Sequence, residues 1–191
     1  TKFSVTGITL DTATLVSPAA TIYGSANVIQ DLAIHDLAIL SEFMNITQIE
    51  SVLAVGNRHF GQQIEEAHLH LQWPGEFHAH IHVSWLSPVK VRRTILAGTK
   101  AMVTYDDLEP SEKIRIYDSG VDHDATKPDP FFPKYRSGDI RIPALSGTET
   151  LVIEAKHILK CVRGEEEPRV PGLAGLAIMR ILEAANKSME T

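Results

Sequence analysis

Five histidines fall within fifteen positions of the stretch EEAHLHLQWPGEFHAHIHVSW, which covers residues 65–85. Neutral imidazoles are common ligands of zinc and of other divalent transition metals, and His-x-His pairs on strands supply such ligands in several enzymes. Residues two apart on a strand point to the same face of a sheet, so the stretch predicts two rows of imidazoles. The rows are His68 with His70, and His78 with His80 and His82.

The turn between the two rows decides whether the imidazoles can meet. If Trp73 opposes Phe77 across the turn, His70 faces His80 and all five side chains gather on one face of the sheet. If Pro74 opposes Phe77 instead, the register moves by one residue and the two rows lie on opposite faces. The sequence leaves both registers open.

We expect these histidines to lie on a solvated or subunit-facing sheet surface and not to bind a metal. The nearest metal-binding pattern is that of the cupins, in which a glycine, a His-x-His pair and a glutamate follow one another at set spacing, and the spacing here differs. A zinc site made from the five histidines is the alternative. On either interpretation the opposite face of the second strand buries a row of apolar side chains, namely Ala79, Ile81, Val83 and Trp85.

The elements that must position these residues follow from the hydrophobic periodicity. A period of two predicts an opening strand at 3–10 and a run of strands between 46 and 118, and short loops between such strands favour antiparallel pairing. The helical period appears at 27–45, at about 148–163 and at 172–188. A segment rich in Pro, Gly and Asp at 118–143 is typical of a long surface excursion. The expected strands after the first are 46–56, 65–73, 76–86, 91–98, 100–106 and 112–118.

The first expected helix has a clear amino-terminal signal. Asn27 and Gln30 have the spacing of a capping box, in which each side chain accepts a hydrogen bond from the other residue's backbone amide. Four residues then follow at helical spacing: Leu32, Asp36, Ile39 and Phe43. Strands in the middle with helices at both ends predict one α+β domain over residues 1–191, with a large open, mainly antiparallel sheet and helices packed on one face.

Composition and charge exclude several classes of protein. The 191 residues are 43% hydrophobic and 22% charged, as in ordinary globular proteins. A net charge of −6 with interspersed acids and bases argues against nucleic-acid binding. A single cysteine, Cys161, cannot form an intrachain disulfide, and no apolar run approaches the roughly 20 residues that span a bilayer. We therefore expect a soluble, cytoplasmic protein that contacts no membrane.

The stretch at 79–118, AHIHVSWLSPVKVRRTILAGTKAMVTYDDLEPSEKIRIYD, resembles the carboxy-terminal domain of the Gfo/Idh/MocA family of NAD(P)-dependent oxidoreductases. The likeness extends to DLAIHDLAIL at 31–40 and to the closing helices, and so covers nearly the whole chain. The resemblance implies an open sheet that shapes a substrate pocket and usually forms the subunit interface. It also implies a preceding Rossmann domain that holds NAD or NADP. That domain is absent from this sequence, in which no G-x-G triplet occurs, so we expect this chain alone to hold no cofactor.

The family's first helix carries an Asp-x-x-x-His pair, matched here by Asp31 and His35. Residues i and i+4 share one face of a helix, where a carboxylate can fix the tautomer of an imidazole and raise its basicity. The resemblance implies that His35 serves as acid/base for the hydroxyl that loses hydride. The glycine triplet and the Glu-Lys-Pro lysine of the family have no counterpart here.

Three cations in SPVKVRR could bind anionic groups of a nucleotide-sugar or a carboxylated substrate: Lys90, Arg92 and Arg93. Solvated charges on the outer row of a strand are the alternative. The sequence as a whole predicts the substrate-binding and oligomerisation domain of a sugar or nucleotide-sugar dehydrogenase, which forms a homodimer or a higher oligomer through the open sheet face. Two alternatives remain, a noncatalytic dimerisation or binding module and a His-rich metal-binding β domain.

Overall fold

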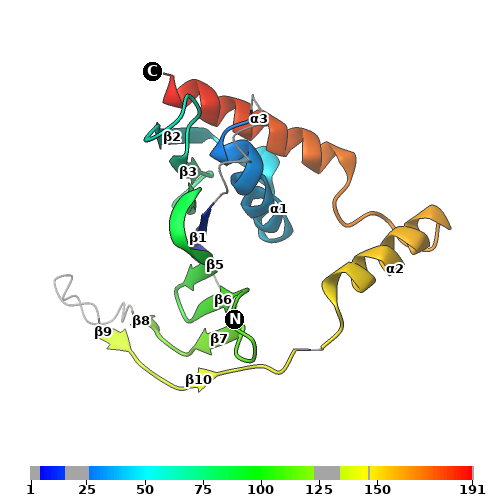
Figure 1. Cartoon of the computed structure of the whole chain (residues 1–191). Coiled ribbons are helices and arrows are strands. Elements are labelled where there is room, and N and C mark those ends of the chain that lie inside the picture. Colours follow the sequence, from blue (N-terminus) through cyan, green and yellow to red (C-terminus); the bar gives the residue numbers. More distant parts are fainter. Residues whose placement is uncertain (1–4, 16–25, 123–133, 146, 191) are drawn as a thin grey trace.

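The computed structural model describes residues 5–15, 26–122, 134–145 and 147–190. An eight-stranded sheet forms its centre, in the order β10-β7-β6-β5-β1-β4-β3-β2 (Figure 1). Its neighbouring strands pair antiparallel except β1 and β4, which are parallel. The expected α+β class with a mainly antiparallel open sheet is therefore confirmed. The strands of this sheet are β1 (Val5–Leu15), β2 (Ser51–Asn57), β3 (Glu66–Gln72), β4 (His78–Ser84), β5 (Leu86–Gly98), β6 (Met102–Asp106), β7 (Ile114–Tyr117) and β10 (Ile140–Arg141).

Two helices cover one face of the sheet, and a third lies apart from it (Figure 1). The covering helices are α1 (Ile34–Phe43) and α3 (Gly172–Met189), while α2 (Thr150–Val162) projects away. Two short strands, β8 (Gly120–Asp122) and β9 (Lys134–Arg136), pair outside the main sheet. The expected surface excursion at 118–143 thus contains short strands, and its residues 123–133 lie outside the described part.

The hydrophobic core lies between the sheet and the two covering helices. Leu69 of β3 and Ile81 of β4 are fully buried on the helix-facing side, together with Leu37 of α1 and Leu182 of α3. Alternate residues of β4 explain this arrangement, because side chains along a strand point to opposite faces in turn. The expected buried row is confirmed at Ala79, Ile81 and Val83, and Trp85 packs against the core while partly exposed.

The β3–β4 turn settles the register that the sequence left open. The backbone N–H of Trp73 donates to the carbonyl oxygen of Phe77 at 3.1 Å, and the two rings pack edge to face with centroids 5.0 Å apart. Gly75 occupies the turn at φ +85°, a conformation that favours glycine. As a result His70 pairs with His80, and all five histidines lie on the face that no helix of the described residues covers.

The first helix begins as its capping signal predicts. The backbone N–H of Asn27 donates to Oε1 of Gln30 at 3.0 Å, and the backbone N–H of Gln30 donates to Oδ1 of Asn27 at 3.2 Å. One π-helical turn, η2 (Ile29–Ala33), precedes α1, a difference from the single α-helix expected at 27–45. Leu32 is buried on the sheet-facing side. After α1, a turn of 3₁₀-helix, η3 (Ile46–Gln48), leads into β2.

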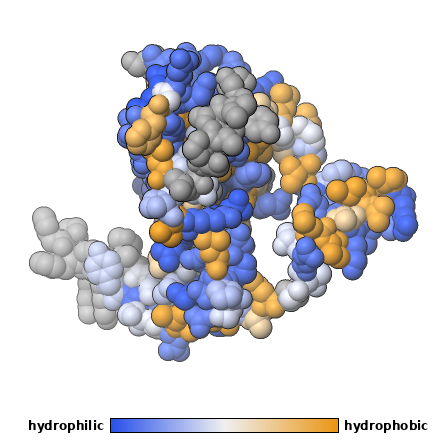
Figure 2. Space-filling model, viewed as in Figure 1, coloured by the Kyte–Doolittle hydropathy of each residue, from blue (hydrophilic) through white to orange (hydrophobic). Residues whose placement is uncertain are grey.

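Helix α2 buries none of its side chains in the chain described here. Figure 2 shows hydrophobic side chains gathered on the projecting arm that contains this helix. Its exposed apolar residues are Leu151, Val152, Ile153, Ile158, Leu159 and Val162. None of the helices in the described ranges is both long and apolar enough to cross a membrane.

Candidate active-site cleft

A cleft of about 390 Å³ lies between α1 and the sheet. It forms where β1, β5 and β6 extend beyond the apolar core, so that polar side chains replace the aliphatic ones on the same sheet face. His35 and Asp36 enter the lining from α1. The sheet contributes Thr12 from β1, Arg92, Arg93 and Thr94 from β5, and Tyr105 from β6.

Asp36 is the most unusual group of the cleft, because it is a carboxyl only 4% exposed. The Thr12 hydroxyl donates to its Oδ1 at 2.9 Å. Within the described residues no donor reaches Oδ2. Burial raises the pKa of Asp36 to about 7, against the opposing effects of the Thr12 hydrogen bond and the nearby Arg92 charge. A carboxyl with this pKa can exchange a proton near neutral pH, as acid/base chemistry requires.

The cationic side of the cleft is organised around Asp107. The Tyr105 hydroxyl donates to Oδ1 of Asp107 at 2.8 Å, and Lys113 Nζ lies 3.3 Å from the same oxygen. These hydrogen bonds hold the pKa of Asp107 below its ordinary value, and the one from Tyr105 has the largest effect. Burial and the Asp107 carboxylate raise the pKa of Tyr105 to about 12, so its hydroxyl stays protonated.

The arginine of the cleft, Arg92, is held loosely. Its Nη1 lies 3.8 Å from Asp107, at the limit of ion-pair distances, and its side chain is about half exposed. It can therefore offer donors to an anionic ligand. Arg93 stands opposite Asp11 across β1 and β5, so its side chain points to the open face of the sheet, where its Nη2 lies 3.9 Å from Asp106.

The structure brings some of the predicted site residues together and leaves others apart. His35 is exposed and lines the cleft with Arg92, whereas the Arg93 side chain points to the opposite face of the sheet, beside Asp106. Asp31 is exposed too, but its Oδ2 accepts a hydrogen bond of 2.8 Å from the indole N–H of Trp85, and it does not line the cleft. Lys90 is exposed on β5 outside the lining. No hydrogen bond joins Asp31 to His35 in the part of the chain described.

Sequence reasoning missed Asp36, Thr12 and Tyr105 as members of this cleft. The sequence did carry a signal for Asp36, because this residue follows Leu32 by four positions and therefore shares its face of the helix. Both side chains are buried. A carboxylate in such a row must find a partner or bind a proton. The partner, Thr12, comes from a strand 24 residues earlier, and nothing local in the sequence indicates that pairing.

The raised pKa of Asp36 predicts how stability changes with pH. Its folded-state pKa of about 7 lies above the unfolded value, so the folded state binds the proton more tightly. The contribution of Asp36 to the free energy of unfolding should therefore fall as the pH rises from about 4 to about 7, by up to about 4 kcal/mol. Asp36→Asn should lose much less stability over that range.

Urea unfolding followed at several pH values measures this difference. Glu42→Gln, an exposed substitution on the same helix, is the control and should keep the pH dependence of the wild type. Equal pH dependence in wild type and Asp36→Asn would show that Asp36 does not titrate in this way.

Comparisons with known proteins find the fold but no sequence relative. No family model and no curated protein matches the sequence. Among solved structures, UDP-N-acetylglucosamine 3-dehydrogenase from Acidithiobacillus ferrooxidans matches with a TM-score of 0.74 at 17% identity, over 98% of this chain and 57% of that one. The aldose-aldose oxidoreductase from Caulobacter crescentus matches with a TM-score of 0.72 at 16% identity, over 98% of this chain and 54% of that one.

A third structure is the WlbA dehydrogenase from Bordetella pertussis, solved in complex with NADH and UDP-GlcNAcA. It matches with a TM-score of 0.64 at 15% identity, over 98% of this chain and 52% of that one. The chain thus spans about half the length of the structures it matches. It has the fold of the carboxy-terminal domain of Gfo/Idh/MocA oxidoreductases, which confirms at the level of fold the resemblance seen in residues 79–118.

Proposed function

We propose that this chain is the substrate-binding and oligomerisation domain of an NAD(P)-dependent oxidoreductase that acts on a sugar or a nucleotide-sugar. One observation carries the proposal: the fold shared with such dehydrogenases has, in this chain, a cleft that combines an exposed imidazole, a buried carboxyl and the guanidinium of Arg92. The chain spans about half of its structural neighbours, so a nucleotide-binding domain must complete the enzyme.

Oxidation of a secondary alcohol needs a base at the hydroxyl group. NAD(P), when bound by the completing domain, accepts the hydride that leaves the carbon. As the C–H bond breaks, the hydroxyl proton must pass to a side chain, and the products are a ketone, the reduced nicotinamide and a protonated base. We assign that role to His35, which is exposed in the cleft and makes no hydrogen bond to another described residue.

Asp36 adjoins His35 along α1 and lines the same cleft, with its Oδ2 buried and without a partner among the described residues. In its ionised form this carboxyl favours a protonated imidazole nearby. We assign Asp31 a role in positioning, because its carboxylate ties the turn before α1 to Trp85 at the end of β4.

The open face of the sheet suits an interface with another copy of this chain. It carries the histidine rows together with Leu53 and Val55 of β2, each 57% exposed. Large apolar side chains on an uncovered sheet favour association. We therefore propose that homo-oligomers form through this face, as a noncatalytic dimerisation module would also do.

Loss of His35 should abolish most of the oxidation. In the polypeptide that includes the nucleotide-binding domain, His35→Ala should lower kcat by about 10²- to 10⁴-fold, since it removes the proton acceptor. The measurement is the absorbance of NAD(P)H formed from a panel of aldoses and UDP-sugars. His78→Ala, on the opposite sheet face, is the control. An undiminished rate in His35→Ala would favour the noncatalytic module.

The cation of β5 that lines the cleft should matter more for substrate binding than the one outside it. Arg92→Ala removes a guanidinium from the cleft and should raise KM for an anionic sugar by about tenfold, equivalent to a charge-assisted hydrogen bond of ~1.5 kcal/mol. Lys90→Ala removes a cation outside the cleft and should leave KM near the wild-type value. Steady-state kinetics at low salt decides, and equal effects of both substitutions would refute a specific role for Arg92.

Assembly through the open face should be sensitive to a charge placed there. Leu53→Glu introduces a carboxylate among the exposed apolar residues of β2 and should shift the protein toward the monomer. Leu108→Glu, in the turn after β6, changes charge equally and should not. Light scattering over a range of concentrations measures both, and a monomeric wild type would contradict the proposal.

A further inference from the structure

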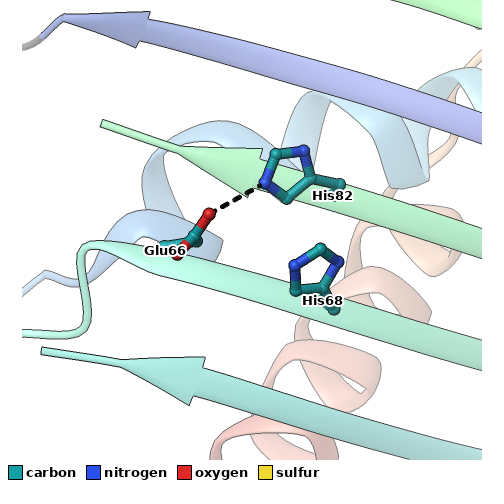
Figure 3. A group of neighbouring side chains, drawn as sticks. All are labelled: Glu66, His68 and His82. Atoms are coloured by element: carbon teal, nitrogen blue, oxygen red, sulfur yellow. Dashed lines mark hydrogen bonds and ion pairs between the residues drawn. The ribbon is translucent and has the colours of Figure 1, made fainter. Parts of the chain in front are cut away.

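Three potential metal ligands meet on the open face of the sheet: Glu66, His68 and His82 (Figure 3). His68 pairs directly with His82 across β3 and β4, and Glu66 stands two residues before His68, so all three share that face. One ligand atom from each residue lies within 4.8 Å of the others. The group lies on the other side of the sheet from the cleft and takes no part in its chemistry.

The distances within this group suit a small divalent cation. His82 Nε2 lies 3.4 Å from Glu66 Oε1. Ligand atoms around a tetrahedral zinc ion with bonds of about 2.0–2.1 Å are about 3.4 Å apart, so this pair already spans one edge of such a tetrahedron. The imidazole planes of His68 and His82 are within 16° of parallel, with centroids 4.5 Å apart.

Two further side chains orient these ligands. Asp11 of β1 lies beside His82 in the parallel β1–β4 pairing, and its Oδ1 is 2.9 Å from His82 Nδ1. A carboxylate at that nitrogen holds the proton on Nδ1 and leaves the Nε2 lone pair free toward Glu66. His59 Nε2 lies 3.3 Å from the other Glu66 oxygen, Oε2. This pattern of a carboxylate behind a ligating histidine is the usual one in zinc sites.

Charge favours a cation at this position, because Glu66 is one of the three ligands and Asp11 lies 2.9 Å from His82, so that two carboxylates stand at the site.

We propose that Glu66, His68 and His82 bind a divalent transition-metal ion of the zinc class, with Asp11 and His59 as orienting residues and water completing the coordination. Two histidines and a carboxylate form the ligand set of zinc sites that keep an open position. This assignment is narrower than a site of five histidines, because His70, His78 and His80 stand farther along the strands from Glu66.

Zinc titration of the chain without a histidine tag tests the proposal. Isothermal titration calorimetry near neutral pH should show one Zn²⁺ per chain. Glu66→Gln, His68→Gln and His82→Gln should each weaken binding at least about tenfold, and Asp11→Asn by about 10- to 100-fold. His78→Gln changes a histidine on the same strand and face that is not a ligand, and it should bind as the wild type does.

A second measurement keeps the test decisive if a variant is unstable. Co²⁺ bound to the wild type should give the absorption of a tetrahedral or five-coordinate ion, and circular dichroism should show that each variant is folded. Affinity should fall as the pH falls, since the imidazoles must be neutral to bind. Wild-type binding weaker than about 1 mM, or a loss in His78→Gln as large as in His68→Gln, would overturn the proposal.

Discussion

The insertion of β1 between β4 and β5 is the constraint on which the rest of the structure depends. Adjacent residues of this strand point to opposite faces, so Thr12 lies on the helix side and Asp11 on the open side. Thr12 donates to the buried Asp36 carboxyl, and Asp11 holds the His82 imidazole. A shift of β1 by one residue would turn Thr12 to the open side and Asp11 to the helix side, so that Asp36 would lose Thr12 and His82 would lose Asp11.

The buried carboxyl of Asp36 depends on a partner that lies 24 residues away in the sequence. An ionised group that is 96% inaccessible costs free energy unless it is paired, and Asp36 has only one hydrogen bond, from Thr12. The fold tolerates this because the carboxyl can accept a proton. Such retention of an unfavourable group in the interior, near Arg92 and an exposed imidazole, is typical of a functional site.

The sequence predicted those features that local interactions determine. The Asn27 and Gln30 capping box set the start of the first helix, and the alternation of β3 and β4 identified the buried row. The register of the β3–β4 turn could not be predicted, because Trp73 and Pro74 were equally consistent with the pattern. The edge-to-face packing of Trp73 on Phe77 and the Trp73 indole hydrogen bond to the carbonyl of Asn45 favour one register in the folded chain.

The parallel pairing of β1 with β4 was equally inaccessible, since 71 residues separate Asp11 from His82. As a result, the groups on the two sides of β1 need different protonation states: Asp36 on the helix side and the proposed metal ligands on the open side. On the helix side, burial keeps the Asp36 proton exchangeable near neutral pH. On the open side, the carboxylate and the imidazoles must be free of protons at their ligand atoms to bind a metal. Acid therefore opposes metal binding on that face while it keeps Asp36 neutral on the other.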